Sequence, residues 1–309
     1  MGSTFVVRGL TVLILVGVCA PAVRAADPPD DVDFHRDIVY GKGGDVDLKL
    51  NLARPKSPPG RKLACIVVIH GGGWAAGDRT NHDDLTWKFA QHGYVSATIG
   101  YRLAPAHRFP AQVNDVKCAV RFLRAHAEQY GLDPDHVGAI GFSAGAHLSM
   151  MLGVTDTKDG LEGDGGSPNQ SSKVQAVVSF FGPTDLLAED IPEQVLGILS
   201  NFIGGTKQEK REEYKKASPI TYVTPDDPPM LLFQGTKDPL VPHTQTYPML
   251  EAMTRSGVKG RIELLLGAGH GWGEPELRRT AAAAFIFFDE HLKPKVPNGQ
   301  AAAQGNRGG

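Results

Sequence analysis

The sequence feature that most constrains the fold is a Gly-x-Ser-x-Gly pattern at residues 141–145, which stands between two different kinds of segment. An apolar run precedes it, and a helix-like run begins directly after Ser143. A serine at the tip of so tight a turn requires small neighbours two residues away, here Gly141 and Gly145. The pattern predicts a nucleophile elbow, in which the hydroxyl points out of a sheet beside a helix N-terminus. On this pattern alone, a glycine-rich turn between strand and helix explains the residues equally well.

Apolar runs and helical patterns alternate along most of the chain, and this alternation predicts an α/β fold. Residues 63–69 are apolar throughout, which is typical of a strand buried on both faces of a sheet. Residues 33–40 and 45–52 alternate polar and apolar side chains, as half-exposed antiparallel strands do. The pattern predicts a mostly parallel, doubly wound sheet with antiparallel N-terminal strands. The further expected strands are 94–99, 137–140, 174–181, 230–233 and 262–266, and the clearest helices contain 113–123 and 277–292.

A serine nucleophile needs a base and an acid that orients the base, and the chain offers a candidate for each. Asp238 and His270 follow two consecutive expected strands. The carboxyl ends of parallel strands meet at one edge of a sheet, so Ser143, Asp238 and His270 are predicted to form a catalytic triad. Their order along the chain is nucleophile, acid, base, as in α/β-hydrolases. Asp185, which follows the preceding strand, is the rival acid.

The segment His70-Gly-Gly-Gly-Trp74 follows the expected strand 63–69 and is predicted to contribute to an oxyanion hole. Glycines there let backbone N–H groups approach a carbonyl oxygen without intervening side chains. The expected donors are Gly72, Gly73 and Ala144. The alternatives are a plain turn and a phosphate-binding loop, but the Lys-Ser/Thr of a P-loop does not follow these glycines.

Two insertions have different expected roles because they arise from opposite edges of the expected sheet. Residues 156–173 join a helix to the next strand, so a solvated loop is expected at the edge away from ligands. Residues 182–229 follow a strand and rise from the functional edge, where helical pieces at 192–202 and 207–216 predict a small insertion lid. Three aromatic residues are candidates for substrate contacts, and positions in the core explain them equally well. They are Trp74, Phe142 and Trp272.

Three other polar features have a structural interpretation that competes with a functional one. His147 lies one turn beyond Ser143 and is expected to be a hydrogen-bonded helix histidine. Arg102 is expected to brace its loop rather than to touch substrate. The polar run 82–84 is expected to cap the following helix, with metal binding as the alternative.

The first 25 residues are expected to form a secretory signal peptide outside the fold. Arg8 precedes an apolar run at 10–18, and small residues fit a cleavage site after Ala25. The run is short for a membrane span. A lipoprotein anchored through Cys19 is the alternative. Residues 26–293 are expected to form the folded domain, and 294–309 a disordered tail.

Composition limits the partners that this chain is expected to have. The formal net charge of −2 over 309 residues gives no polyanion-binding signature, so nucleic acid is not an expected partner. Cys65 and Cys118 fall in an expected core strand and helix, so buried free thiols are expected, although export would permit a disulfide. The sequence contains no CxxC pair and no cluster of Cys and His residues with the spacing of a zinc site.

The chain resembles serine esterases of the α/β-hydrolase fold, in the group that holds hormone-sensitive-lipase-like enzymes and secreted acetylxylan or feruloyl esterases. The resemblance implies hydrolysis of small-molecule or carbohydrate-linked carboxylic esters, without a cofactor or metal. The cap helices of hormone-sensitive-lipase-like enzymes are not seen before residue 33, which favours the carbohydrate-esterase branch. A peptidase or amidase, or a non-catalytic binding protein with this fold, is the alternative. The resemblance covers roughly 35–293 and rests on motifs at 70–74, 101–105, 109–110, 141–148, 238–239 and 270–271.

Overall fold

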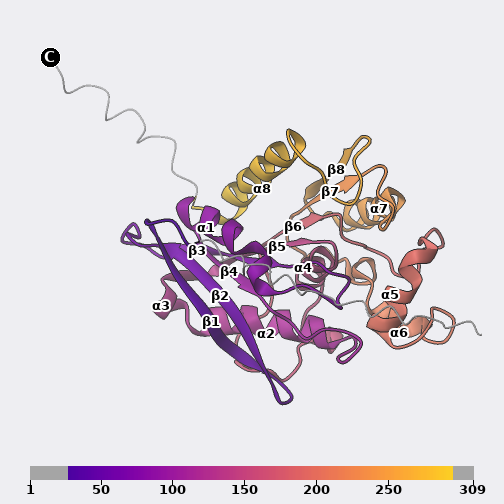
Figure 1. The fold of residues 1–309 in the computed structure, drawn as a ribbon, viewed down its shortest axis with the longest axis horizontal. Helices are drawn as coiled ribbons and strands as arrows, with labels where there is room; N and C mark the ends of the chain where they lie inside the picture. Colours follow the sequence, from indigo (N-terminus) through magenta and orange to yellow (C-terminus); the bar gives the residue numbers. More distant parts are fainter. Residues whose placement is uncertain (1–26, 295–309) are drawn as a thin grey trace, which may run out of the picture.

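A single eight-stranded sheet lies at the centre of the computed structural model, which describes residues 27–294 (Figure 1). The strand order is β1-β2-β4-β3-β5-β6-β7-β8. β2 is antiparallel to both β1 and β4, and all other neighbours are parallel, which confirms the predicted fold class. The strands are β1 (Val32–Gly43), β2 (Val46–Pro55), β3 (Leu63–Ile69), β4 (Val95–Ile99), β5 (Leu132–Phe142), β6 (Ala176–Phe180), β7 (Met230–Gly235) and β8 (Gly260–Leu265).

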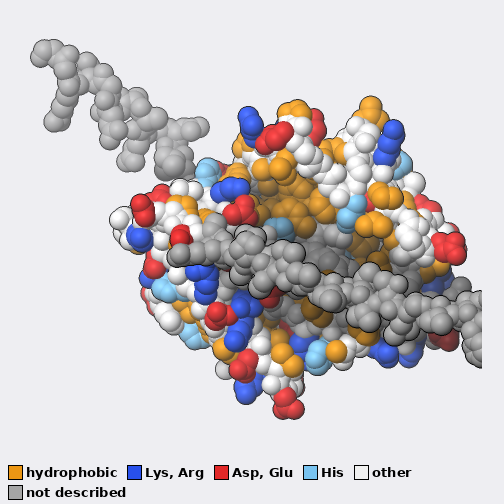
Figure 2. Space-filling model, in the orientation of Figure 1, with side chains coloured by type: hydrophobic (Ala, Val, Ile, Leu, Met, Phe, Trp, Pro, Cys, Tyr) orange, Lys and Arg blue, Asp and Glu red, His pale blue; other side chains and the backbone are white. Residues whose placement is uncertain are grey.

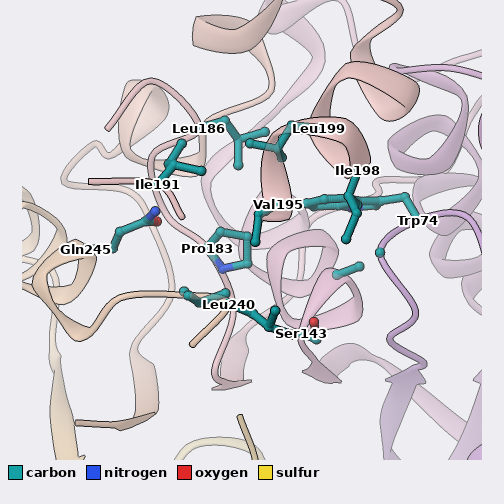
Figure 3. Close-up of a pocket in the computed structure, with 13 residues that line it drawn as sticks. Trp74, Ser143, Pro183, Leu186, Ile191, Val195, Ile198, Leu199, Leu240 and Gln245 are labelled. Carbon is teal, nitrogen blue, oxygen red and sulfur yellow. The ribbon is translucent and has the colours of Figure 1, made fainter. Parts of the chain in front are cut away.

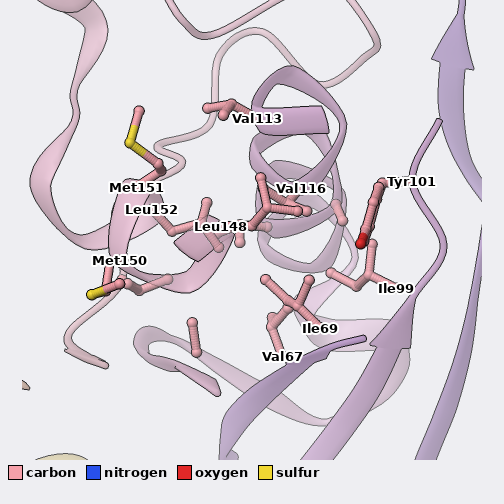
Figure 4. Packing of buried hydrophobic residues seen from close by; sticks show 14 of the residues in the cluster. Val67, Ile69, Ile99, Tyr101, Val113, Val116, Leu148, Met150, Met151 and Leu152 are labelled. Atoms are coloured by element: carbon pink, nitrogen blue, oxygen red, sulfur yellow. The ribbon is translucent and has the colours of Figure 1, made fainter. Parts of the chain in front are cut away.

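Helices cover both faces of this sheet, and each face has its own hydrophobic core. Val67 of β3 packs in the core that includes side chains of α2 and α4 (Figure 4). The neighbouring Ile66 and Val68 face the other way and pack with side chains of α1 and α8. This alternation is why the central strands read as continuous apolar runs. The helices are α1 (Asp83–Gln91), α2 (Ala111–Ala125), α3 (Ala127–Tyr130), α4 (Ala144–Val154), α5 (Glu193–Ile203), α6 (Arg211–Lys216), α7 (Thr246–Ser256) and α8 (Glu276–Leu292).

The expected signal peptide, with Cys19, lies outside the described residues, and so does nearly all of the expected tail. Among the described residues, no helix combines the length and the apolar character that a bilayer span requires. Cys65 and Cys118 are both buried and free, as the sequence predicted. Burial raises the pKa of the Cys65 thiol to about 12, so this group stays protonated at neutral pH.

The insertion 156–173 is anchored, so the expectation of a merely solvated loop is wrong. Its Glu162 carboxylate accepts hydrogen bonds from Lys117 Nζ at 2.6 Å and Arg121 Nη1 at 2.8 Å. The Lys117 side chain is completely buried, so its charge requires this partner. The loop carbonyl of Gly165 also accepts a hydrogen bond from the β1 amide of Lys42. The insertion is thereby tied to both α2 and β1.

The polar run 82–84 does not cap α1 as expected. His82 occupies the cap position without a side-chain hydrogen bond to the helix. Asp83 is instead the first residue of α1, and its carboxylate accepts a hydrogen bond from Asn51 Nδ2 at 2.9 Å. The side-chain cap lies one turn earlier, where Asp78 accepts from the Thr80 amide at the start of a 3₁₀ turn. Asp83 therefore links α1 to β2.

Candidate active site

Ser143 sits at the junction of β5 and α4 in a strained backbone conformation. Its φ of 54° and ψ of −118° lie in a region that residues with a side chain rarely adopt. A Cβ added to Gly141 would lie 2.2 Å from the carbonyl oxygen of Gly145. A Cβ on Gly145 would lie 2.1 Å from the carbonyl oxygen of Ile69. Both glycines of the pattern are therefore required by close backbone approach, and the turn has the geometry of the predicted elbow.

The structure brings Ser143, His270 and Asp238 together at the carboxyl edge of the sheet. His270 Nε2 lies 2.9 Å from Ser143 Oγ, and His270 Nδ1 lies 2.8 Å from Asp238 Oδ2. A carboxylate only accepts hydrogen bonds, so the proton of the neutral imidazole is on Nδ1. Nε2 is then free to accept the proton of the serine hydroxyl. These three groups have the arrangement that a Ser-His-Asp triad requires.

Asp238 is held in place by four hydrogen bonds besides its burial. Its Oδ1 accepts from the backbone amides of Leu240 at 2.8 Å and Val241 at 2.9 Å. Its Oδ2 accepts from Gln234 Nε2 at 2.9 Å and from His270. Burial alone would raise the pKa of this carboxyl, but the hydrogen bonds from His270 and the two amides lower it below its ordinary value. Asp238 is therefore ionised at neutral pH and fixes the imidazole ring.

Gln234 is a contributor that the sequence reasoning missed. It lies on β7, directly after the apolar run that was expected to end at residue 233. A fully buried amide at the end of an otherwise apolar strand is the signal that could have identified it, since a buried polar group needs partners. No hydrogen bond among the described residues joins the carboxylate of the rival acid Asp185 to His270. Its carboxylate accepts from the amide of Leu187 at 2.8 Å.

The three expected oxyanion donors do not have equivalent positions. Gly73 and Ala144 line the same pocket as Ser143, and no described residue accepts a hydrogen bond from either amide. Gly72 is not among the residues that line this pocket. Its carbonyl accepts from the amide of Ala76 at 2.9 Å, and its φ of 110° favours glycine. The Gly72 amide, like those of Gly73 and Ala144, has no acceptor among the described residues.

The pocket beside Ser143 has a volume of about 90 Å³ and a mostly apolar lining (Figure 3). The insertion 182–229 supplies much of the wall, because side chains of α5 and of the segment before it lie over the serine. Trp74 forms another wall, and its indole stacks on Phe202 of α5 with centroids 4.2 Å apart. The lining residues are Gly73, Trp74, Ser143, Ala144, Pro183, Leu186, Ile191, Val195, Ile198, Leu199, Leu240, Val241 and Gln245.

Of the three aromatic residues expected at the pocket, only Trp74 lines it. Phe142 lines a separate hollow of about 430 Å³ between α1 and α8, where hydrophobic side chains gather on the visible face (Figure 2). Trp272 packs against Phe181 with centroids 5.4 Å apart, and its indole donates to Thr280 Oγ1. Phe142 and Trp272 belong to the α1/α8 side of the sheet, whereas the pocket lies on the side of α4. Sequence proximity to the serine does not reveal which face a side chain takes.

His147 and Arg102 have the structural roles that the sequence predicted. His147 is completely buried, accepts from Trp74 Nε1 at 3.2 Å and contacts the carbonyl of Ala217 through Nε2 at 2.6 Å. It therefore joins the pocket wall to the C-terminal end of α6 in the insertion. Arg102 makes a two-pronged ion pair with the buried carboxylate of Asp115, with Nη2 2.7 Å from Oδ1.

Comparisons with known proteins agree on the family of this chain. The sequence model of the BD-FAE family matches residues 50–253. The esterase LipQ of Mycobacterium tuberculosis is 32% identical over 224 residues, which are 72% of this chain and 53% of LipQ, so the chain spans about half of that relative's length.

Two solved structures of esterases have the same fold. A truncated carbohydrate esterase from gut microbiota has a TM-score of 0.73 at 26% identity, over 85% of this chain and 99% of that one. The propionate-bound esterase Est2 of Thermogutta terrifontis has a TM-score of 0.72 at 29% identity, over 86% of this chain and 97% of that one. The chain therefore belongs to the BD-FAE family and has the α/β-hydrolase fold of its esterase relatives.

Proposed function

We propose that the protein hydrolyses carboxylic esters of short acyl groups through a covalent intermediate on Ser143. The observation that carries this proposal is the hydrogen-bonded chain from Ser143 Oγ through the His270 imidazole to the buried carboxylate of Asp238. A lone serine hydroxyl is a poor nucleophile at neutral pH, and this chain supplies the base that activates it. The match to the BD-FAE family and the similarity to the esterase LipQ support the same reaction class.

The reaction follows from the positions of the three side chains. Ser143 Oγ attacks the ester carbonyl carbon as His270 Nε2 takes its proton, and the carbonyl oxygen becomes an oxyanion. The C–O bond to the alcohol then breaks, and His270 gives the proton to the departing alkoxide. Water attacks the acyl-enzyme and passes a proton to His270. Collapse of the second tetrahedral intermediate releases the carboxylic acid, and the proton returns to Ser143.

The amides of Gly73 and Ala144 are the proposed oxyanion donors. Both residues line the pocket with Ser143, and their N–H groups have no acceptor among the described residues. Such free donors stabilise negative charge that develops on the carbonyl oxygen in the transition state, by about 3–4 kcal/mol for one donor. The Gly72 amide also lacks an acceptor there, but Gly72 does not line the pocket, so in this proposal it holds the turn before Gly73.

The pocket under α5 is proposed to hold the acyl group rather than the alcohol. His270 must protonate the leaving alcohol, so the alcohol lies on the side of the imidazole. The pocket is lined by Ser143 and both proposed oxyanion donors but not by His270. The opposite group of the ester, which is the acyl chain, is therefore the one that enters it.

The size of the pocket favours a short acyl chain over a feruloyl group. Its volume of about 90 Å³ is smaller than the roughly 150 Å³ cavity that accommodates one benzene ring in another protein. Acetyl, propionyl and butyryl groups have fewer non-hydrogen atoms than benzene, and the name of the Est2 structure records a bound propionate. The proposal includes acetyl esters of polysaccharides, because the sugar is the alcohol part of such an ester and would lie outside the pocket.

Export is a separate proposal, which rests on the sequence of residues 1–25. Arg8, the apolar run at 10–18 and the small residues before Ala25 together support a cleavable signal peptide. Expression in a host with a secretion pathway tests it. Export with a mature N-terminus at Ala26 is expected, whereas an intact N-terminus in the cell extract would contradict the proposal.

Ester hydrolysis is tested with p-nitrophenyl acetate, butyrate and decanoate. The wild type is expected to cleave acetate and butyrate and to lose kcat/KM steeply at decanoate. Ser143→Ala is expected to abolish this activity. A matched control is Ser149→Ala, because Ser149 lies on the same helix and donates to the carbonyl of Gly145. Substantial hydrolysis by the Ser143 variant would overturn the proposal.

A further inference from the structure

Gln245 is the polar exception in the wall of the acyl pocket. Apart from Ser143 and Gln245, the described residues that line the pocket have apolar side chains. Trp74 has one polar atom, its indole nitrogen, which already donates to His147. Gln245 lies between the acid-bearing loop after β7 and α7, and its side chain points into the pocket beside Ile191 and Pro183 (Figure 3). Only 4% of the residue is exposed to solvent. Its amide is therefore a buried polar group that faces the substrate space.

The orientation of this amide follows from its partners. Gln245 Oε1 accepts from the backbone amides of Thr184 at 2.9 Å and Asp185 at 3.2 Å. Both partners are donors, so the atom that faces them must be the oxygen, and the NH₂ group occupies the other position. The hydroxyl of Thr184 also donates to the main-chain carbonyl of Gln245 at 2.8 Å. Two bonds therefore hold the side-chain oxygen, and the third holds the backbone of the same residue.

The NH₂ group of Gln245 has no acceptor among the described residues. Its Nε2 atom is not among the described buried side-chain atoms that lack a partner, so it keeps some contact with solvent, and Figure 3 shows the amide end of the side chain on the side of the acyl pocket. Water can satisfy this donor while the pocket is empty. An alkyl chain that fills the pocket would displace that water and leave the N–H groups unpaired, which is unfavourable.

We propose that Gln245 selects acyl groups that carry an oxygen acceptor beyond the scissile carbonyl, such as ether, hydroxyl or keto oxygen. This inference rests on the proposed function and adds the substrate class. The apolar walls accept the carbon atoms of a short chain, and Nε2 donates to the oxygen. A site built to hydrogen-bond one substrate atom discriminates strongly against an analogue that lacks it, because the site's own group is then left unpaired.

The test uses two matched pairs of p-nitrophenyl esters. Methoxyacetate is compared with butyrate, and 3-methoxypropionate with pentanoate, so that an oxygen replaces one methylene in chains of equal length. The ether oxygen also changes the intrinsic reactivity of the ester. That effect cancels when the ratio of kcat/KM values within a pair is compared between wild type and variant.

The principal variant is Gln245→Glu. One carboxylate oxygen can still accept from the amides of Thr184 and Asp185, while the other replaces the donor by an acceptor. Gln245→Met is the second variant, because it removes the donor without adding charge and serves if the first variant does not fold. Thr184→Val is the matched control, since it removes a hydrogen bond to Gln245 but leaves the NH₂ group in place.

The expected result is a preference for the ether ester in at least one pair, which falls by about tenfold or more in both Gln245 variants and is retained in Thr184→Val. Unchanged ratios in folded variants would overturn the inference while leaving the esterase proposal intact. A ratio that falls equally in Thr184→Val would also overturn it, because the effect would then be structural. If the wild type cleaves none of the four esters, both proposals fail.

Discussion

Protonation of His147 is expected to destabilise the fold in mild acid. This imidazole is completely buried, accepts a hydrogen bond from Trp74 Nε1 and faces the carbonyl of Ala217 with its other nitrogen. Trp74 donates to Nδ1, so the single proton of the neutral ring is on Nε2. A second proton on Nδ1 would face the indole N–H and be buried with the charge it brings. Burial accordingly lowers the pKa of His147 from 6.5 to about 4, against the smaller opposing effect of the Ala217 carbonyl.

The magnitude follows from linkage between protonation and folding. The folded-state pKa is depressed, so the stability contribution of neutral His147 is fully present above the unfolded pKa of 6.5 and is lost as the pH falls towards 4. Between about pH 7.5 and about pH 4.5, this one group is expected to lower the free energy of unfolding by roughly 2–3 kcal/mol. That is a large share of the net stability of a typical domain.

The assay is equilibrium unfolding in urea at both pH values, for the wild type and for His147→Gln. Glutamine can accept from Trp74 and donate to Ala217, but it does not titrate. Other groups also titrate in this range, and their contribution is common to both proteins. The wild type is therefore expected to lose roughly 2–3 kcal/mol more than the variant between the two pH values. An equal loss in the two proteins would refute this account of His147.

Three further substitutions have defined expected outcomes. Asp238→Asn is expected to lower kcat by about 10⁴-fold, because the amide no longer holds the reactive tautomer of His270, whereas an equal loss in Asp185→Asn would contradict this assignment. Val195→Phe is expected to narrow the acyl pocket. The kcat/KM for butyrate relative to acetate should therefore fall by at least about tenfold. An unchanged ratio would mean that the acyl chain binds elsewhere. Arg102→Met leaves the buried Asp115 carboxylate without its ion-pair partner. The free energy of unfolding, measured in urea, is expected to fall by about 3–5 kcal/mol. A loss of less than about 1 kcal/mol would contradict the role of this ion pair.

The fold and the clustering of Ser143, Asp238 and His270 were predictable because they depend on local patterns and one topological rule. Buried parallel strands read as apolar runs, and residues that follow them meet at one edge of the sheet. The α7 helix was not among the clearest expected helices, although Met249 and Met253 form part of a buried apolar face on it. The insertion 156–173 was misjudged because its anchor, Glu162, pairs with a lysine and an arginine distant in sequence.

The pocket was less predictable than the triad for a physical reason. Its walls come from α5, the loop after β7 and the turn at Gly73, and their relative placement depends on tertiary packing. Phe142 is adjacent to the serine in sequence but turns to the opposite face of the sheet. Gln245 carries no local signal at all. Its importance follows from contacts with Thr184 and Asp185, some 60 residues earlier in the chain.

The central claim is that Ser143 is a nucleophile activated by His270 and Asp238. The most direct measurement is covalent labelling by a fluorophosphonate, read out by intact mass and by mapping the modified peptide. The account predicts one label per chain, located on Ser143, with labelling slowed drastically in His270→Gln and absent in Ser143→Ala. Labelling at another residue, or an undiminished rate in folded His270→Gln, would contradict it.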